Sequence, residues 1–125
     1  MAETTNITHI TTVIVPVSDQ DKALEFYTGT LGFEKRRDMP FGQGDRWVEV
    51  APAGGTTTIA LVQAREDGQP VEISFMSGKV DDDHAGLRAQ GVDSDPEVLR
   101  FGGGVPPMFT FRDPDGNRFR IVEGG

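Results

Sequence analysis

Along this chain, short stretches in which apolar and β-branched residues alternate with polar ones are interrupted by two stretches of helical periodicity. Leu24, Tyr27 and Leu31 recur at the spacing of one helix face, which predicts a helix over residues 21–31. A second, shorter helix is predicted over residues 81–90, because its three opening aspartates favour the positive end of a helix dipole. The remaining patterned stretches predict strands at residues 10–17, 33–37, 46–50, 56–63, 71–76, 108–112 and 117–123.

The predicted elements form one pattern that occurs twice along the chain. Thr12 and Glu72 lie 60 positions apart in corresponding strands, as do Ala60 and Arg120. Each copy is expected to have the order βαβββ, although the second strand of the second copy would fall in the loop-rich residues 93–104, and the turn-rich residues 65–70 connect the two copies. This predicts an α+β fold in a single domain over residues 1–125, with module one at about 7–64 and module two at about 70–123.

Composition narrows the classes of function. The net charge of −8 is spread along the 125 residues, which argues against nucleic-acid binding through phosphate contacts. The chain has no cysteine, so disulfides, thiolate catalysis and thiolate metal sites within it are excluded. No apolar run has membrane length, and residues 1–8 lack the pattern of a signal peptide. We therefore expect a cytoplasmic protein that binds neither nucleic acid nor membrane.

Two motifs carry a resemblance to a known family. Phe26-Tyr27 is followed by Leu31-Gly32-Phe33, and Phe111-Arg112-Asp113-Pro114-Asp115-Gly116-Asn117 precedes the last strand. With the duplicated pattern, these motifs resemble the vicinal oxygen chelate superfamily, which includes glyoxalase I, fosfomycin- and bleomycin-resistance proteins and extradiol dioxygenases. The resemblance implies two tandem βαβββ modules that form a cupped mixed sheet, with helices on the outer face and a ligand in the cup. It also implies a homodimer.

The resemblance further implies where a divalent metal would be held. Enzymes of this superfamily usually place His, Gln or Glu on the first and last strands of each module, at positions that correspond here to Thr12, Ala60, Glu72 and Arg120. Only Glu72 is an ordinary ligand, because Ala60 has no donor and Arg120 carries a fixed positive charge. A metal site normally needs three or more protein donors, so we expect neither a metal nor another cofactor.

Glu72 and Arg120 permit several interpretations. If both side chains face the cup, each would be costly to bury alone, which predicts a salt bridge between them on the cup floor. Alternatively, Arg120 and Arg118, which share a strand face, present donors to an anionic ligand. The pair could equally be an internal ion pair without a role in binding.

Other candidates for the cup lining follow from alternation along the strands. Thr58 shares a face with Ala60, and Met76 shares one with Glu72. Trp47, the only tryptophan, lies in a strand expected to line the cup, where it either stacks on a planar ligand or packs in the core. The candidate ligand-binding set is therefore Thr12, Trp47, Thr58, Ala60, Glu72, Met76, Arg118 and Arg120.

The two histidines and the aspartate run are alternative candidates for a metal site. His9 stands an odd number of positions from Thr12, so a regular strand places it on the opposite face, and we expect a surface histidine. We expect His84 to be exposed to solvent and Asp81–Asp83 to be surface charges at a helix start.

These observations support two interpretations of function. The first is a glyoxalase/bleomycin-resistance-like protein that binds a small organic molecule in its cup without the superfamily's usual metal. The second is a lyase, isomerase or dioxygenase of glyoxalase type. Such an enzyme would need a displaced metal site, or metal-free acid–base chemistry with Glu72 as the candidate catalytic residue. Whether the chain is an enzyme is left open by the sequence.

Overall fold

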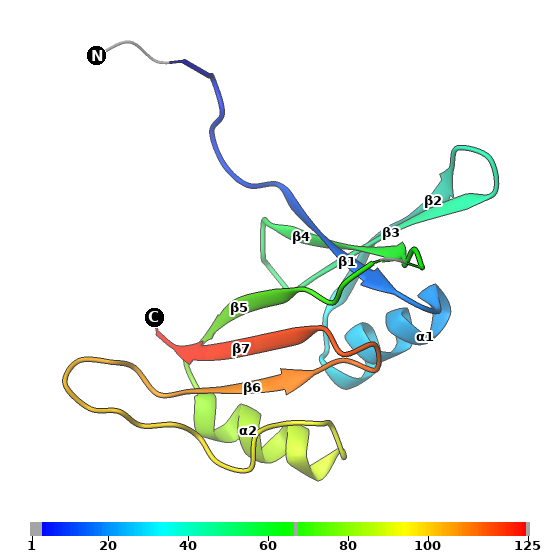
Figure 1. Ribbon diagram of the computed structural model, residues 1–125. Coiled ribbons are helices and arrows are strands. Elements are labelled where there is room, and N and C mark those ends of the chain that lie inside the picture. Colours follow the sequence, from blue (N-terminus) through cyan, green and yellow to red (C-terminus); the bar gives the residue numbers. More distant parts are fainter. Residues whose placement is uncertain (1–3, 67, 125) are drawn as a thin grey trace.

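The computed structural model describes residues 4–66 and 68–124 and contains two sheets with helices packed against them (Figure 1). The elements of the first half are β1 (Thr12–Val17), α1 (Gln20–Glu25), η1 (Phe26–Thr30), β2 (Glu34–Phe41), β3 (Asp45–Ala51) and β4 (Thr58–Gln63). Those of the second half are β5 (Glu72–Ser77), α2 (Val80–Ala89), β6 (Met108–Arg112) and β7 (Arg118–Glu123). The predicted α+β fold with a duplicated strand and helix pattern is confirmed.

The two sheets repeat one topology. Sheet one has the strand order β1-β4-β3-β2, with β1 parallel to β4 and the other pairs antiparallel. Sheet two has the order β5-β7-β6, with β5 parallel to β7 and β6 antiparallel to it. In each half, therefore, the first strand pairs with the last one, which makes neighbours of residues that are 46 positions apart in the sequence. Thr12 lies opposite Thr58 in this way, and Glu72 lies opposite Arg118.

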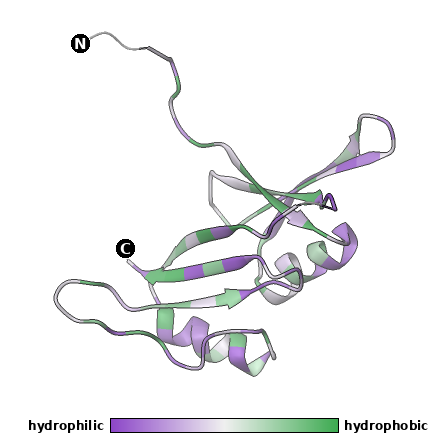
Figure 2. Cartoon of the chain, viewed as in Figure 1, coloured by the Kyte–Doolittle hydropathy of each residue, from purple (hydrophilic) through white to green (hydrophobic). Residues whose placement is uncertain are grey.

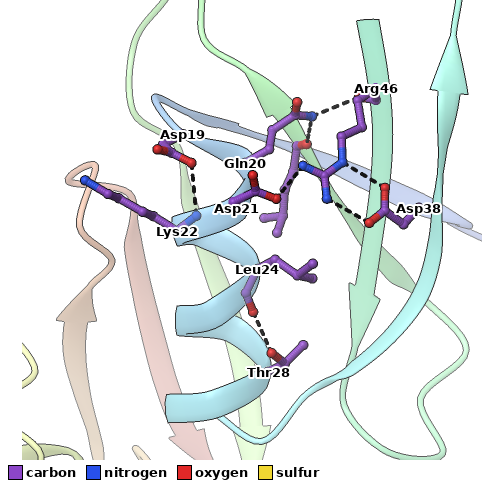
Figure 3. Close-up of polar contacts among 9 residues, drawn as sticks. Asp19, Gln20, Asp21, Lys22, Leu24, Thr28, Asp38 and Arg46 are labelled. Atoms are coloured by element: carbon purple, nitrogen blue, oxygen red, sulfur yellow. Dashed lines mark hydrogen bonds and ion pairs between the residues drawn. The ribbon is translucent and has the colours of Figure 1, made fainter.

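The first helix differs in its geometry from the uniform helix predicted over residues 21–31. The Asp19 side chain caps its start by accepting a hydrogen bond from the Lys22 amide at 3.0 Å (Figure 3). After Glu25 the chain continues as the π-helical turn η1. The Thr28 hydroxyl donates to the Leu24 carbonyl at 2.6 Å, and such a bond competes with the regular helical ladder. Gly32, with φ of 77°, ends the element as predicted.

Module two departs from the predicted βαβββ order. The expected second strand is replaced by an extended connection in which Ser94 and Leu99 form single bridges to β6. The Leu99 amide donates to the Met108 carbonyl at 2.7 Å, and the Asp95 amide donates to that of Thr110 at 2.9 Å. Pro96 lies between these two points and has no amide proton, so a continuous ladder cannot form there.

The hydrophobic core lies between the helices and the facing side of each strand. Along β7, buried Phe119 and Ile121 alternate with exposed Arg118 and Arg120, and Figure 2 shows this alternation as green and purple segments. Tyr27, from η1, is fully buried, and its ring lies 5.9 Å from that of Phe119. The side of each strand that faces away from the helices is left outside this core. Within the part of the chain that the structure describes, no helix is long and apolar enough to cross a bilayer.

A buried polar cluster joins the two halves of the chain. Asp113 accepts the Tyr27 hydroxyl proton at 2.7 Å and the Asn117 side-chain amide at 2.8 Å. Asn117, which is fully buried, also donates to the Pro16 carbonyl at 2.8 Å and accepts from the Val71 amide at 2.9 Å. The turn motif that carries the family resemblance therefore fastens β1 and η1 of one half to β5 and β7 of the other.

The ionisation of Tyr27 provides a test of this buried cluster. Burial, reinforced by the negative charge of Asp113, raises the pKa of the Tyr27 phenol far above its ordinary value of 10.0. A group whose pKa is higher in the folded state contributes stability that is complete below its unfolded pKa and is lost at higher pH. We therefore expect the free energy of unfolding to fall as the pH rises above 10, and the phenol to ionise only with unfolding.

Ultraviolet difference absorbance can follow this step because Tyr27 is the only tyrosine of the chain. The matched variant Tyr27→Phe should lose stability less steeply in alkali. A phenol that ionises near its ordinary pKa while circular dichroism still reports a folded protein would contradict the expectation.

Candidate functional site

The side of each sheet that faces away from the helices is the candidate site, and we call these sides inner face one and inner face two. Strand registers and burial patterns place on inner face one the residues Thr12, Ile14, Arg37, Met39, Phe41, Trp47, Glu49, Thr58 and Ala60. Inner face two carries Glu72, Ser74, Met76, Thr110, Arg118 and Arg120. The eight residues predicted to line a cup are thus divided equally between the two faces.

Glu49 organises the polar part of inner face one. Its carboxylate accepts the Trp47 indole proton at 2.5 Å and the Thr58 hydroxyl proton at 2.9 Å. A hydroxyl has a single proton, so Thr58 in turn accepts from Thr12, whose hydroxyl oxygen lies 2.8 Å away. The Arg37 guanidinium lies 3.9 Å from the same carboxylate. Four side chains from β1, β2, β3 and β4 are therefore oriented by one acid.

The electrostatics of Glu49 follow from these contacts. The hydrogen bond from Trp47, aided by that from Thr58 and by the charge of Arg37, lowers the pKa of Glu49 below its ordinary value, against the opposing effect of desolvation. Its side chain is only 14 % exposed. Glu49 is consequently ionised at neutral pH, where it acts as a hydrogen-bond acceptor rather than as a proton donor.

Trp47 packs against its neighbours on inner face one rather than in the core. Its ring lies 5.5 Å from the ring of Phe41, at an interplanar angle of 41°. Met39 stands opposite Trp47 in the β2–β3 register, and both Phe41 and Met39 are exposed. Together these three side chains form an apolar surface on which a flat molecule can stack.

Arg46 holds the β2–β3 hairpin, and with it this aromatic surface, against α1 (Figure 3). Its guanidinium contacts Asp21 at 2.6 Å and Asp38 at 2.8 Å, while the Gln20 side chain donates to the Arg46 carbonyl at 2.8 Å. The hydrogen bond from Arg46 lowers the pKa of Asp38. These contacts place Arg46 at the edge of inner face one, where the β2–β3 hairpin extends beyond the rest of sheet one.

On inner face two, the predicted ion pair is formed. Arg120 and Glu72 approach to 3.4 Å, diagonally across the parallel β5–β7 pair. Both side chains are close to half exposed, at 44 % and 49 %, so the pair lies on an open surface rather than in a closed cup. Arg118 is exposed beside them, and Met76 is 73 % exposed. An open pair of this kind contributes at most about 1 kcal/mol to stability.

A groove of about 460 Å³ marks the seam between the two sheets. Sheet one contributes Val13 and Ile59 to its lining, Ile10 borders it just before β1, and β5 contributes residues from Ile73 to Met76. Most of the groove's lining is apolar. Ser74 and Met76 of inner face two also border this groove, together with the hydroxyl side chains of Thr56 and Thr57.

The two histidines have different environments. His9 is exposed, as expected, and its ring nitrogen Nδ1 lies 2.8 Å from the Thr8 hydroxyl. The expectation that His84 is fully exposed is wrong: it is half-buried, with its ring 4.9 Å from that of Phe109 and Nε2 2.7 Å from the Asp95 carbonyl. The extended connection that replaces a strand in module two covers this side chain, which sequence periodicity did not indicate.

Comparison with known proteins relates this geometry to a family. Residues 6–121 match the family model described as Glyoxalase/Bleomycin resistance protein/Dioxygenase superfamily. The chain belongs to this superfamily. Its fold is that of the glyoxalase-like α+β proteins, and the family resemblance of the sequence is confirmed.

Individual relatives within the superfamily are similar over almost their whole length. The chain is 31 % identical over 123 residues to the protein YetH of Bacillus subtilis (strain 168), covering 94 % of this chain and 99 % of the relative. TnmS3, an antibiotic binding protein from Streptomyces sp. CB03234, superposes with a TM-score of 0.83 at 34 % identity, covering 97 % and 99 %. A superfamily member from Sphaerobacter thermophilus DSM 20745 has a TM-score of 0.86 at 35 % identity, covering 94 % and 98 %.

The residues at the superfamily's metal positions do not fit a metal ion in this chain. The Thr12 hydroxyl is committed to Thr58, and Ala60 has no donor atom. Glu72 is paired with Arg120, whose positive charge would repel a cation. Within residues 4–66 and 68–124, no three His, Asp or Glu side chains gather where they could hold a metal. Glu72 alone is an insufficient donor set.

Sequence reasoning missed the residue at the centre of inner face one. Glu49 is two positions from Trp47 in a predicted strand, so alternation would have placed the two on one face. It also missed Met39 and Phe41, because the strand predicted at residues 33–37 is shorter than β2. Polar residues and Pro40 obscure the pattern there, and pairing with β3 extends the strand despite them.

Proposed function

We propose that this superfamily member binds a small organic molecule on its inner faces, without the metal that the superfamily's enzymes usually hold. The observation that carries the proposal is the substitution of a side-chain network for metal ligands: Thr12 is bonded to Thr58, and Glu72 is paired with Arg120. Beside this network, Trp47 and Phe41 offer an aromatic surface. The similarity to TnmS3, an antibiotic binding protein, supports binding of an organic ligand rather than catalysis.

The proposed binding site includes a second copy of the chain. Ile14 and Phe41 on inner face one are 56 % and 59 % exposed, and Met76 on inner face two is 73 % exposed. Apolar side chains this exposed on open sheet faces are typical of surfaces that a partner covers. A second copy that covers these apolar side chains in a homodimer would enclose the ligand between the two chains. Solution scattering at several protein concentrations tests this: a monomeric mass throughout would count against it.

Two measurements on the purified protein test the binding proposal. A thermal-shift screen over metals, thiols, aromatic metabolites and antibiotics, with bleomycin among them, should raise the melting temperature for an organic ligand. Because Trp47 is the only tryptophan, the same ligand should change the intrinsic fluorescence. Elemental analysis should find no stoichiometric metal. Nickel, zinc, iron or manganese bound at one equivalent per chain would overturn the metal-free part of the proposal.

The variant Glu72→Gln distinguishes binding from glyoxalase-type catalysis. Removing the charge that pairs with Arg120 should change stability by less than about 1 kcal/mol, because both side chains are well exposed. We expect wild type and variant alike to lack turnover in a methylglyoxal–glutathione assay, while ligand affinity shifts modestly. A wild-type activity that disappears in Glu72→Gln would instead identify Glu72 as a catalytic acid or base.

A further inference from the structure

A second cavity lies beside α2, on the helix side of sheet two. It has a volume of about 350 Å³ and is bordered by the end of η1, by α2 and by β5. We call it the outer pocket. Its lining includes Phe33, Phe75, Leu87, Gly86, Asp82 and Asp83. Phe75 and Met76 also border the seam groove, but the residues of α2 belong to the outer pocket alone.

The floor of the outer pocket is aromatic and apolar. Phe33 and Phe75 are half-buried, and their rings meet edge to face at 5.7 Å and 76°. Leu87, from the buried side of α2, completes the floor. Partly exposed aromatic rings at the base of a concave site offer both apolar contact and a negative π face to a ligand.

The rim of the outer pocket is acidic. Asp82 is exposed and, among the residues that the structure describes, it has no ion-pair partner. Asp83 accepts a hydrogen bond from the Ser77 hydroxyl, which leaves its charge in place. Asp81 does not contribute, because Arg100 contacts both of its oxygens at 2.6 Å. No lysine or arginine is found among the described residues that line the pocket.

Gly86 keeps the pocket open. It lies within α2, where glycine is less favourable than alanine by about 1 kcal/mol. A Cβ added at Gly86 would meet nothing within 4 Å, so the space in front of the helix is free. A cavity of about 150 Å³ accommodates benzene. The outer pocket is more than twice that size, which leaves room for one aromatic ring and a polar end.

From this combination we propose that the outer pocket binds an organic ammonium ion. The flat hydrocarbon part of such a ligand lies against Phe33 and Phe75, and its cationic end lies at the rim beside Asp82. The carboxylates and the aromatic floor both attract a cation, and the net charge of −8 favours its approach. Of the residues assigned to the inner faces, Met76 alone borders the outer pocket, and neither Trp47 nor the Glu72–Arg120 pair takes part, so this proposal can fail separately from the function proposed above.

The test uses three probes of similar size on the full-length protein: phenethylammonium, benzyl alcohol and benzoate. In ¹H–¹⁵N correlation spectra, phenethylammonium should shift the amides of Ser77, Asp82, Gly86 and Leu87. Benzyl alcohol should bind more weakly and benzoate not at all. Added sodium chloride should weaken the binding of the cation, because the rim charges are exposed to solvent.

Two variants locate the site. Gly86→Leu fills the pocket while keeping a good helix former in α2, and it should abolish the shifts. Asp82→Asn should weaken phenethylammonium about two- to fivefold without affecting benzyl alcohol. Asp45→Asn, a change of equal charge at the distant β2–β3 hairpin (Figure 1), is the matched control and should leave both affinities unchanged.

Three results would overturn the proposal. The first is the absence of shifts at millimolar phenethylammonium. The second is equal binding of benzoate and phenethylammonium. The third is binding that persists in a folded Gly86→Leu protein with shifts confined to the inner faces, which would assign the cation to the other site.

Discussion

We expect Asp113→Ala to lower the free energy of unfolding by about 3–5 kcal/mol, the largest effect of any single substitution considered for this protein. Asp113 is 5 % exposed and accepts protons from Tyr27, from the Asn117 side chain and from the backbone amides of Asp115 and Asn117. Alanine leaves these donors without their acceptor at a position where the Tyr27 hydroxyl and the Asn117 side chain are fully buried. Urea unfolding followed by circular dichroism measures the loss.

The control lies in the same turn. Asp115→Ala removes a carboxylate that accepts only an exposed hydrogen bond, from the Ser18 amide at 3.0 Å, and it should destabilise by less than about 1 kcal/mol. Tyr27→Phe removes one donor to Asp113 and should have an intermediate effect. Equal stability of the two alanine variants would mean that the buried cluster does not hold the modules together.

The second large effect is expected in ligand binding. Trp47→Ala should weaken the organic ligand found by the thermal-shift screen by about 2 kcal/mol, or roughly thirtyfold in affinity. Trp47 supplies the largest apolar surface on inner face one, and its position is fixed by Phe41 on one side and Glu49 on the other. Tryptophan anchors that are held in place in this way contribute more to binding than mobile side chains. Isothermal titration calorimetry measures the affinity, since the variant has lost its fluorescent probe.

Two further variants separate the causes. Trp47→Phe keeps a ring but loses the proton donated to Glu49, so it should retain most of the affinity if stacking dominates. Phe101→Ala removes an aromatic side chain that is 65 % exposed, in the connection between α2 and β6, and it should leave binding unchanged. Unaltered affinity in a folded Trp47→Ala protein would exclude inner face one as the ligand site.

The strands and helices could largely be predicted from local pattern, and the exceptions have identifiable causes. The alternation along β7 and the helical spacing through Tyr27 indicate which side of each element is buried. The pattern predicts the element because the buried side must be apolar to pack in the core. β2 is longer than predicted because its pairing with β3 compensates for exposed residues throughout. Module two lacks one expected strand because Pro96 has no amide proton for the hydrogen bonds to β6. This effect could not be predicted without knowing that β6 lies beside Pro96.

The candidate site could be predicted only in part. The ion pair between Glu72 and Arg120 follows from the repeat, because the first and last strands of a module are parallel neighbours. Its half-exposed state does not follow, since exposure depends on what the two sheets leave uncovered. The importance of Glu49 was also hidden, because two of its partners, Arg37 and Thr58, lie in other strands.

By itself, the order of residues determined the duplicated α+β architecture, the turn at Asp113–Asn117 and the loss of metal donors at Thr12, Ala60 and Arg120. These features depend on periodicity and on side-chain chemistry, which are local properties. Only the tertiary structure decided that Glu49 gathers Trp47 and Thr58, and that the inner faces are open while a separate pocket forms beside α2. Those features depend on the distances between strands and helices that are remote in sequence, and packing alone sets such distances.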